Sequence, residues 1–194
     1  MRRKRGGLNF NRKRKKFNFK KLWEVLSWIG SIAIVIVLAY VTVSFFGKRT
    51  TVVGQAMSPT LGSNEQIWVN RLAFAIGNPH AGDVVVFLPN GNEKSHYYVR
   101  RVVACPGDTV QIQDGALYVN GSLYKEKVDV PAMEEAGLAE EPITLASDEF
   151  FLLGDNRNNS EDSRFANIGN VKKDYIVGKP WFHFKSIKKF GFIR

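Results

Sequence analysis

Ser58 carries a hydroxyl that could attack a carbonyl, and Lys94 and His96 carry side chains that could take up its proton. Ser58 precedes Pro59, which disfavours helix and predicts an extended segment that ends in a tight turn. Gly54, four residues earlier, permits positive φ or a close approach of the backbone. The same spacing also fits a plain strand and turn leading into a second strand at residues 66–70. Both interpretations remain open on these residues alone.

A polar run at residues 154–164 is the second stretch suited to a site. Asp162 and Arg164 could form an ion pair, and the side chains of 155–157 offer turn and cap hydrogen bonds. This pattern fits either an exposed polar loop or a buried network, and both remain open on these residues alone. No His, Cys and Asp cluster has metal-ligand spacing, so no metal or organic cofactor is expected. The single Cys105 excludes an internal disulfide framework.

The positive charge of the chain lies almost entirely at its start. Residues 1–21 hold 11 of the 28 Lys and Arg residues and no acid, and the remainder is close to neutral. Residues 25–47 form an uncharged run of 23 residues, which as a helix is about 34 Å long against a hydrocarbon core of about 30 Å. A cleaved secretory signal usually has a shorter apolar region and a small-residue cleavage site.

We therefore predict a basic cytoplasmic tail at 1–21, a transmembrane helix at 22–46 and an extracytoplasmic domain at 47–194. Lys and Arg before the span set that side in the cytoplasm, so the protein is expected to be single-pass in the cell membrane, with the lipid bilayer as a partner. A tail rich in Lys, Arg and Phe could instead bind nucleic acid. Its position beside the span favours a lipid surface, and no nucleic-acid partner is expected.

The rest of the chain reads as short strands and turns. Apolar or alternating runs predict strands at 52–57, 66–70, 83–88, 97–103, 149–153 and 174–177. Asp114-Gly115 predicts a hairpin between 109–112 and 117–119, and Asn120-Gly121 predicts a second turn. Residues 128–147, with several Glu and two Pro, are expected to be an exposed acidic insertion. The predicted fold class is one all-β domain behind one N-terminal transmembrane α-helix.

Four stretches together resemble the bacterial type I signal peptidases, which are Ser/Lys serine peptidases. They are residues 54–61, 82–87, 98–108 and 154–164, and their order, their spacing and the preceding anchor also match. The resemblance runs from about residue 22 to the end. It implies a signal-peptidase-like β domain whose substrate is an exported preprotein bound as an extended strand. It also implies a structural role for Asp155, Arg157, Asp162 and Arg164, and an oxyanion site of backbone amides with a group at the Gly54 position.

The chain departs from that pattern where the chemistry should be. Ala56 stands at the position of the nucleophilic serine, and Ser58 falls on a variable position. Arg100 stands at the position of the general-base lysine, while Arg101 matches the arginine that follows it. Ala81 and Ala104 replace an arginine and a glycine of the pattern. Ser160 matches the serine that orients the lysine of the family.

These two replacements remove the covalent route. Ala56 has no oxygen, and a base must be neutral to accept a proton, whereas an arginine is not deprotonated in proteins. The expected function is a signal peptidase I family protein of the export pathway, inactive or impaired, that binds preproteins, signal peptides or envelope partners. An active signal peptidase or a surface-assembly component is a further expected partner. The alternatives are an active endopeptidase that uses Ser58, and a membrane-surface nucleic-acid binder.

Overall fold

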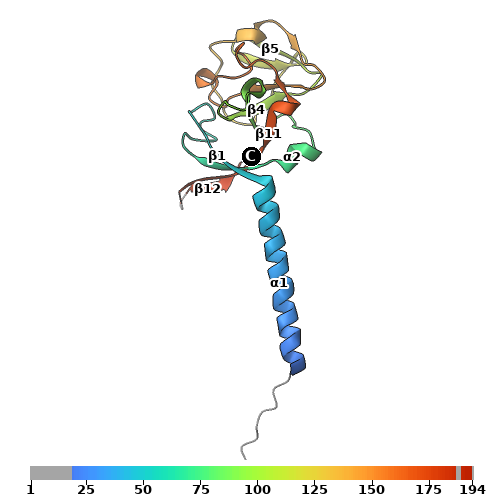
Figure 1. Cartoon of the computed structure of the whole chain (residues 1–194). Helices are drawn as coiled ribbons and strands as arrows, with labels where there is room; N and C mark the ends of the chain where they lie inside the picture. The colour runs from blue at the N-terminus through green and yellow to red at the C-terminus, as the bar shows by residue number, and fades with distance from the viewer. Residues whose placement is uncertain (1–18, 187–188, 194) are drawn as a thin grey trace, which may run out of the picture. The chain divides into compact units, whose positions relative to one another are not determined.

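The computed structural model describes residues 19–186 and 189–193. The chain divides into two compact units, Met1–Val41 and Thr42–Arg194. The predicted basic tail at 1–21 lies almost wholly outside the described residues. Its expected contact with a lipid surface therefore stays a prediction. The units are coloured from blue to red along the chain in Figure 1.

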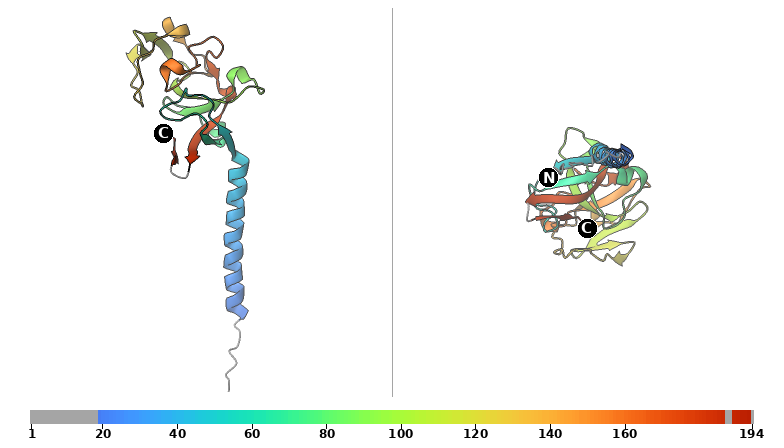
Figure 2. Two further views of the ribbon diagram at one scale, coloured as in Figure 1. Left: turned by 90° about the vertical axis from the view of Figure 1, so that its left-hand side faces the viewer. Right: turned by 90° about the horizontal axis from the view of Figure 1, so that it is seen from below.

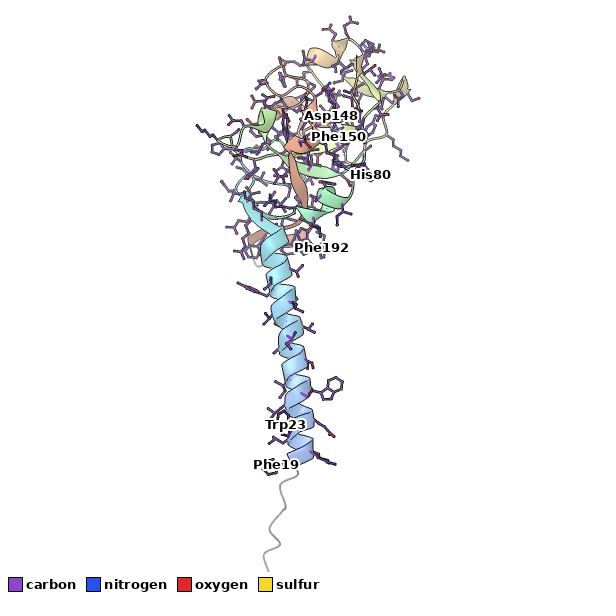
Figure 3. The ribbon with its side chains drawn as sticks, turned by 45° about the vertical axis from the view of Figure 1, so that its right-hand side comes forward. Phe19, Trp23, His80, Asp148, Phe150 and Phe192 are labelled. Carbon is purple, nitrogen blue, oxygen red and sulfur yellow. The ribbon has the colours of Figure 1, made fainter. Side chains whose placement is uncertain are left out.

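Helix α1, Phe19–Phe46, is long and apolar enough to cross a membrane. Its candidate span, Phe19–Val43, has a mean hydropathy of 2.3, and its apolar side chains are exposed, as for Ile32 and Leu38. These side chains project outward around the helix (Figure 3). An apolar helix in which every backbone group is bonded internally suits a hydrocarbon environment. The predicted helix at 22–46 therefore forms and begins three residues earlier than expected.

The second unit is built on an antiparallel sheet of eight strands in the order β1-β2-β11-β3-β4-β9-β10, with β12 paired to β11. The sheet curls on itself, as the two views of Figure 2 show. Its strands are β1 Gly47–Thr51, β2 Gln66–Asn70, β3 Val84–Phe87, β4 Tyr98–Ala104, β9 Glu149–Leu153, β10 Val171–Lys172, β11 Ile176–Ser186 and β12 Lys189–Phe192. The predicted all-β class is confirmed by this mostly β architecture.

A second sheet of four strands has the order β7-β6-β5-β8. Its strands are β5 Thr109–Gln113, β6 Ala116–Val119, β7 Ser122–Leu123 and β8 Ile143–Thr144. Asp114 and Gly115 have φ of 50° and 75°, and Asn120 and Gly121 have φ of 52° and 75°. Both pairs thus supply the two positive φ values that a tight hairpin turn requires, and both predicted turns are confirmed.

Short helical turns connect the strands within the described ranges: α2 Leu72–Ile76, η1 Pro89–Gly91, η2 Gly137–Glu140, η3 Arg157–Asn159 and η4 Lys173–Tyr175. Clusters of buried apolar side chains support the two sheets. Met57 and Leu61 lie in the cluster beneath β2 and β3, at 1% and 0% exposure. The chain around the candidate nucleophile position is therefore anchored from below by packing.

Three details of the predicted elements are wrong. Residues 52–57 form no strand, because β1 ends at Thr51 and the chain then bends and turns from Gly54 to Leu61. Residues 174–177 straddle η4 and the first residues of the eleven-residue β11. The acidic insertion at 128–147 is not simply exposed, because Met133, Ala139 and Leu145 are buried in the core beside the small sheet.

Candidate functional site

Ala56 lies in the turn that follows β1, and this turn is tied to the polar run at 154–164. The Ala56 carbonyl accepts a hydrogen bond of 3.0 Å from the Asn156 amide, and the Asn156 side chain donates to the Gln55 carbonyl at 3.2 Å. Ala56 is 8% exposed. Gly54 has φ of +82°, which favours glycine, and this allows the backbone to turn before Ala56. The first and fourth motifs therefore form one site.

Gly154 brings Ser160 against Ala56. A Cβ at position 154 would lie 2.1 Å from the Ser160 hydroxyl oxygen and 2.6 Å from the Ala56 carbonyl oxygen. No side chain fits at those distances. Gly154 therefore permits a close approach, and the structure places the Ser160 hydroxyl and the Ala56 carbonyl next to it.

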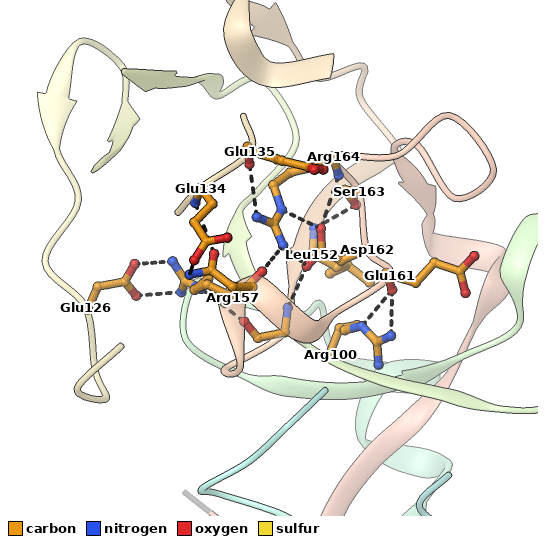
Figure 4. A network of polar contacts seen from close by, with 12 residues as sticks. Arg100, Glu126, Glu134, Glu135, Leu152, Arg157, Glu161, Asp162, Ser163 and Arg164 are labelled. Carbon is orange, nitrogen blue, oxygen red and sulfur yellow. Dashed lines mark hydrogen bonds and ion pairs between the residues drawn. The ribbon is translucent and has the colours of Figure 1, made fainter. Parts of the chain in front are cut away.

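Arg100 lies on β4 opposite Val85, and its guanidinium is committed to backbone carbonyls. Its Nε and Nη2 donate to the Glu161 carbonyl at 2.9 and 2.5 Å, and Nη1 donates to the Val99 carbonyl at 2.7 Å. Figure 4 shows the two bonds to Glu161. Burial lowers the pKa of Arg100, and the carboxylate of Asp162 opposes that shift. The position predicted for a neutral amine therefore holds a buried cation that fixes the 161 loop.

Ser160 lies next to Gly154 in the candidate site. Its hydroxyl oxygen is buried and makes no hydrogen bond to any residue that the structure describes. A small polar cavity of about 90 Å³ lies beside it, between Arg157, Arg164 and Phe165. A hydroxyl buried in this way is uncommon, because burial without a hydrogen bond costs about 1–3 kcal/mol. The family resemblance predicts a lysine amine at position 100 as the partner of the Ser160 hydroxyl, and this chain has an arginine there.

We expect Ser160→Ala to leave the free energy of unfolding unchanged or raise it by about 1 kcal/mol, because it removes a buried hydroxyl that bonds to nothing described. The matched control is Ser163→Ala. The Ser163 hydroxyl accepts from the Leu152 amide at 3.0 Å in a fully buried position, so its loss should cost about 1–3 kcal/mol. Thermal unfolding of the full chain in neutral detergent measures both. Equal losses in the two variants would contradict the prediction.

Arg101 and Asp155 form a fully buried ion pair behind the Ala56 turn. The guanidinium donates from Nε and Nη2 to the two carboxylate oxygens at 2.8 and 2.7 Å, and both side chains are 0% exposed. Thr60 donates to the same carboxylate at 2.5 Å, and Nη1 of Arg101 donates to the Gly82 carbonyl at 2.9 Å. This pair joins the stretches at 54–61, 82–87, 98–108 and 154–164 at one point.

A second buried network holds the far end of the polar run (Figure 4). Arg164 Nε and Nη2 donate to Asp162 at 2.9 and 3.0 Å, and the Gly154 amide donates to Asp162 at 3.1 Å. Arg157 is paired with Glu126 through bonds of 2.6 and 2.9 Å. These bonds hold the loop that carries Ser160.

The structure does not bring the alternative candidates together. Ser58 lies in the turn, where its amide donates to the Gln55 carbonyl, so it does not share the face of a strand with Ala56 as an extended segment would require. Lys94 and His96 are exposed, and no contact that the structure describes joins either to Ser58. No group of three His, Cys, Asp or Glu side chains suited to a metal occurs among the described residues.

Reasoning from sequence did not single out Thr60, Glu126 or Glu161 as parts of the site. Glu126 lies 31 positions from its partner Arg157, and Glu161 contributes its backbone carbonyl to Arg100. Thr60 lies inside the first motif, but nothing in its spacing relates it to Asp155. These contacts depend on how the loops fold together, so no local pattern of residues could have identified them.

Comparison with known proteins gives one consistent relationship. The family model described as "Signal peptidase, peptidase S26" matches residues 25–184. Signal peptidase I P of Bacillus subtilis subsp. natto is 36% identical over 177 residues, covering 86% of this chain and 91% of its own length. Signal peptidase IB of Staphylococcus aureus (strain COL) is 33% identical over 184 residues, covering 86% and 93%. A crystal structure of a signal peptidase I from Enterococcus faecalis V583 matches 54% of this chain and 97% of its own, at 27% identity and a TM-score of 0.42.

Proposed function

Because this chain belongs to the signal peptidase family, peptidase S26, we propose that it binds preproteins bearing signal peptides at the membrane without cleaving them. The observation that carries the proposal is the set of hydrogen bonds made by Arg100 and missing at Ser160 among the described residues. Arg100 turns its guanidinium to the carbonyls of Val99 and Glu161, and the buried Ser160 hydroxyl is left without a described partner. With Ala56 beside it, the pocket offers neither an attacking oxygen nor a neutral base.

The way Arg100 is bound supports a role in binding. Arg100 is only 6% exposed and lies against the ring of Tyr98, with the guanidinium carbon 5.1 Å from the ring centroid. A guanidinium that is fully engaged with carbonyls and with an aromatic face does not extend over the Ala56 turn. Residues 53–55, just before Ala56, are exposed, and this supports approach of a peptide to the turn from that side.

The backbone beside Ala56 supports the binding of an extended segment. Val53 is 67% exposed, and neither Val53 nor Gly54 makes a backbone hydrogen bond within the described part of the chain. Free peptide groups next to a strand end can pair with an extended peptide, which is how many sheet edges recognise their ligands. This arrangement suits the extended region of a preprotein that precedes the mature sequence.

The proposal includes the topology expected from the sequence, with tail 1–21 cytoplasmic, helix 22–46 in the membrane and domain 47–194 outside. The apolar α1 and the family support a membrane-anchored protein. The Lys and Arg residues before α1 favour a cytoplasmic N-terminus. An active signal peptidase or a surface-assembly component as a second partner stays a prediction.

The test uses the full chain in neutral detergent with a small secreted preprotein whose signal peptide ends in Ala-x-Ala. We expect the intact preprotein to be retained by the immobilised protein, and mass spectrometry to find no mature product. The control is the same secreted protein without its signal peptide, which should be retained at least about tenfold less, a difference of about 1.4 kcal/mol. Release of mature protein at ordinary protease turnover would contradict the proposal, as would equal retention of the two forms.

A further inference from the structure

A cavity of about 1010 Å³ lies in the second unit, apart from the Ala56 and Ser160 site. It is bordered by α2, by the start of β11 and by Lys48 of β1. Three basic side chains, Lys48, Arg71 and Lys173, line it together with the carboxylates of Glu93 and Asp174. The lining therefore carries one excess positive charge, which matches a ligand of net charge −1.

Chain connectivity limits how far Lys48 can lie from the end of the candidate membrane span. Val43 is the last residue of the candidate span, and Lys48 follows five residues later, so the two Cα atoms lie at most about 18 Å apart. Gly47 pairs with Asn70 in the β1–β2 hairpin, so Arg71 follows directly at the same end of the hairpin. The headgroup layer outside the hydrocarbon core is about 5–8 Å thick. The short connection between the span and Lys48 favours a ligand from this layer.

The polar groups of the cavity differ in how far they are already engaged. Lys48 Nζ donates to the Tyr97 hydroxyl at 2.5 Å, and Lys173 Nζ donates to Asn78 at 2.5 Å. The side chains of Arg71, Glu93 and Asp174 form no hydrogen bond or ion pair with any described residue. A guanidinium that is free in this way can form two parallel bonds to a phosphodiester. The free carboxylates can accept hydrogen bonds from hydroxyl groups.

An apolar rim adjoins these charges. Leu72 lines the cavity and is 36% exposed, and Ile76 at the end of the same short helix is 82% exposed. A soluble anion would gain nothing from such a rim, whereas a lipid has an acyl region directly beside its phosphate. We propose that this cavity binds the headgroup of an anionic glycerophospholipid. Arg71 and Lys48 contact the phosphodiester, and Glu93 and Asp174 accept bonds from the headgroup glycerol.

The test measures lipid retention by the full chain in neutral detergent, using native mass spectrometry with dihexanoyl-phosphatidylglycerol. We expect Arg71→Gln to weaken retention about tenfold, since it removes one charge-assisted contact. Arg49→Gln is the matched control, because Arg49 is a neighbouring cation that stacks on Trp68 at 4.3 Å and does not line the cavity. It should change retention less than about twofold, as expected for a charge outside the site.

Two further ligands separate the possible sources of binding. Dihexanoyl-phosphatidylcholine has no net charge and should be retained at least about fivefold less than dihexanoyl-phosphatidylglycerol. Inorganic phosphate at equal concentration should not compete with dihexanoyl-phosphatidylglycerol for binding. Equal effects of Arg71→Gln and Arg49→Gln, equal retention of the two lipids, or competition by phosphate would each overturn the proposal. If Arg71→Gln alters the circular dichroism spectrum, Lys48→Gln takes its place. None of these outcomes depends on whether the protein cleaves preproteins.

Discussion

The double substitution Ala56→Ser with Arg100→Lys is expected to raise cleavage of a signal-peptide substrate by about 10³-fold or more over the unchanged protein. In another serine protease the complete catalytic set contributes about 2 × 10⁶ in kcat, so partial recovery of geometry still leaves a large effect. The introduced serine would supply the hydroxyl, and the introduced lysine would supply an amine whose orienting partner, by the family resemblance, is the Ser160 hydroxyl, which now lacks a described partner. Burial would lower the pKa of that lysine toward the value a base requires.

The single substitutions are the first control. Catalytic residues that act as a unit are not additive, so Ala56→Ser alone and Arg100→Lys alone should each stay within about tenfold of the unchanged protein. The assay counts cleaved product from a synthetic signal-peptide substrate by mass spectrometry. Failure of a folded double variant to exceed both single variants would contradict the assignment of positions 56 and 100.

Ser58→Ala is the second control and addresses the relocated nucleophile. If Ser58 were catalytic, this variant would abolish an activity that the unchanged protein already shows, and the double substitution would add little. Ser58 lies in a turn and not on an extended strand with Ala56. A misplacement of about 1 Å can cost about 10²-fold. We therefore expect Ser58→Ala to have no effect on cleavage.

Asp155→Ala is expected to lower the free energy of unfolding by about 3–5 kcal/mol. It would leave the Arg101 guanidinium buried at 0% exposure without the carboxylate that receives two of its bonds. It would also remove the acceptor of the Thr60 hydroxyl. For a domain of this size the change corresponds to a melting temperature lower by on the order of 10 °C. Near-ultraviolet circular dichroism of the full chain in detergent follows it.

Lys179→Ala is the matched control for this ion pair. Lys179 and Asp83 also form a bond of 2.7 Å, but their side chains are 40% and 19% exposed. A pair in contact with solvent contributes about 0–1 kcal/mol. The two ion pairs therefore have the same bond length and differ in burial. A similar loss of stability in both would show that burial is not what makes the Arg101 pair important.

The sequence predicted those elements of the fold whose signal is local. The hairpin at Asp114-Gly115 requires positive φ at adjacent residues, and only a few residue pairs supply it at low cost. The runs at 84–87 and 149–153 are largely apolar because β3 and β9 lie in the interior of the sheet. The length of β11 was not predictable, since it pairs with β2, β3 and β12 in turn and its residues suit no single face.

The candidate site was predictable in part, for a related reason. Ala56, Arg100 and Ser160 were selected by their positions in motifs, and the structure brings the 56 and 160 positions together across Gly154. The bonds from Arg100 to the Glu161 carbonyl were not predictable, because a guanidinium has several rotamers and carbonyl acceptors leave no trace in a sequence. The turn at Ala56 was mistaken for a strand, because Pro59 favours extended geometry before it but does not fix the residues further back.

Arg164 belongs to the candidate site and also contacts the segment at 135–138, which packs beside the small sheet. Its Nη1 donates to the Glu135 carbonyl at 3.1 Å, and its own carbonyl accepts from the Leu138 amide at 2.8 Å. Arg157 bonds to Glu126, which also lies outside the motif. Loss of these arginines would therefore break the contacts between the 154–164 motif and the segments at 126 and 135–138, whether or not the protein cleaves a substrate. An intact 154–164 motif is thus explained by its structural role, and its presence is no evidence of catalytic activity.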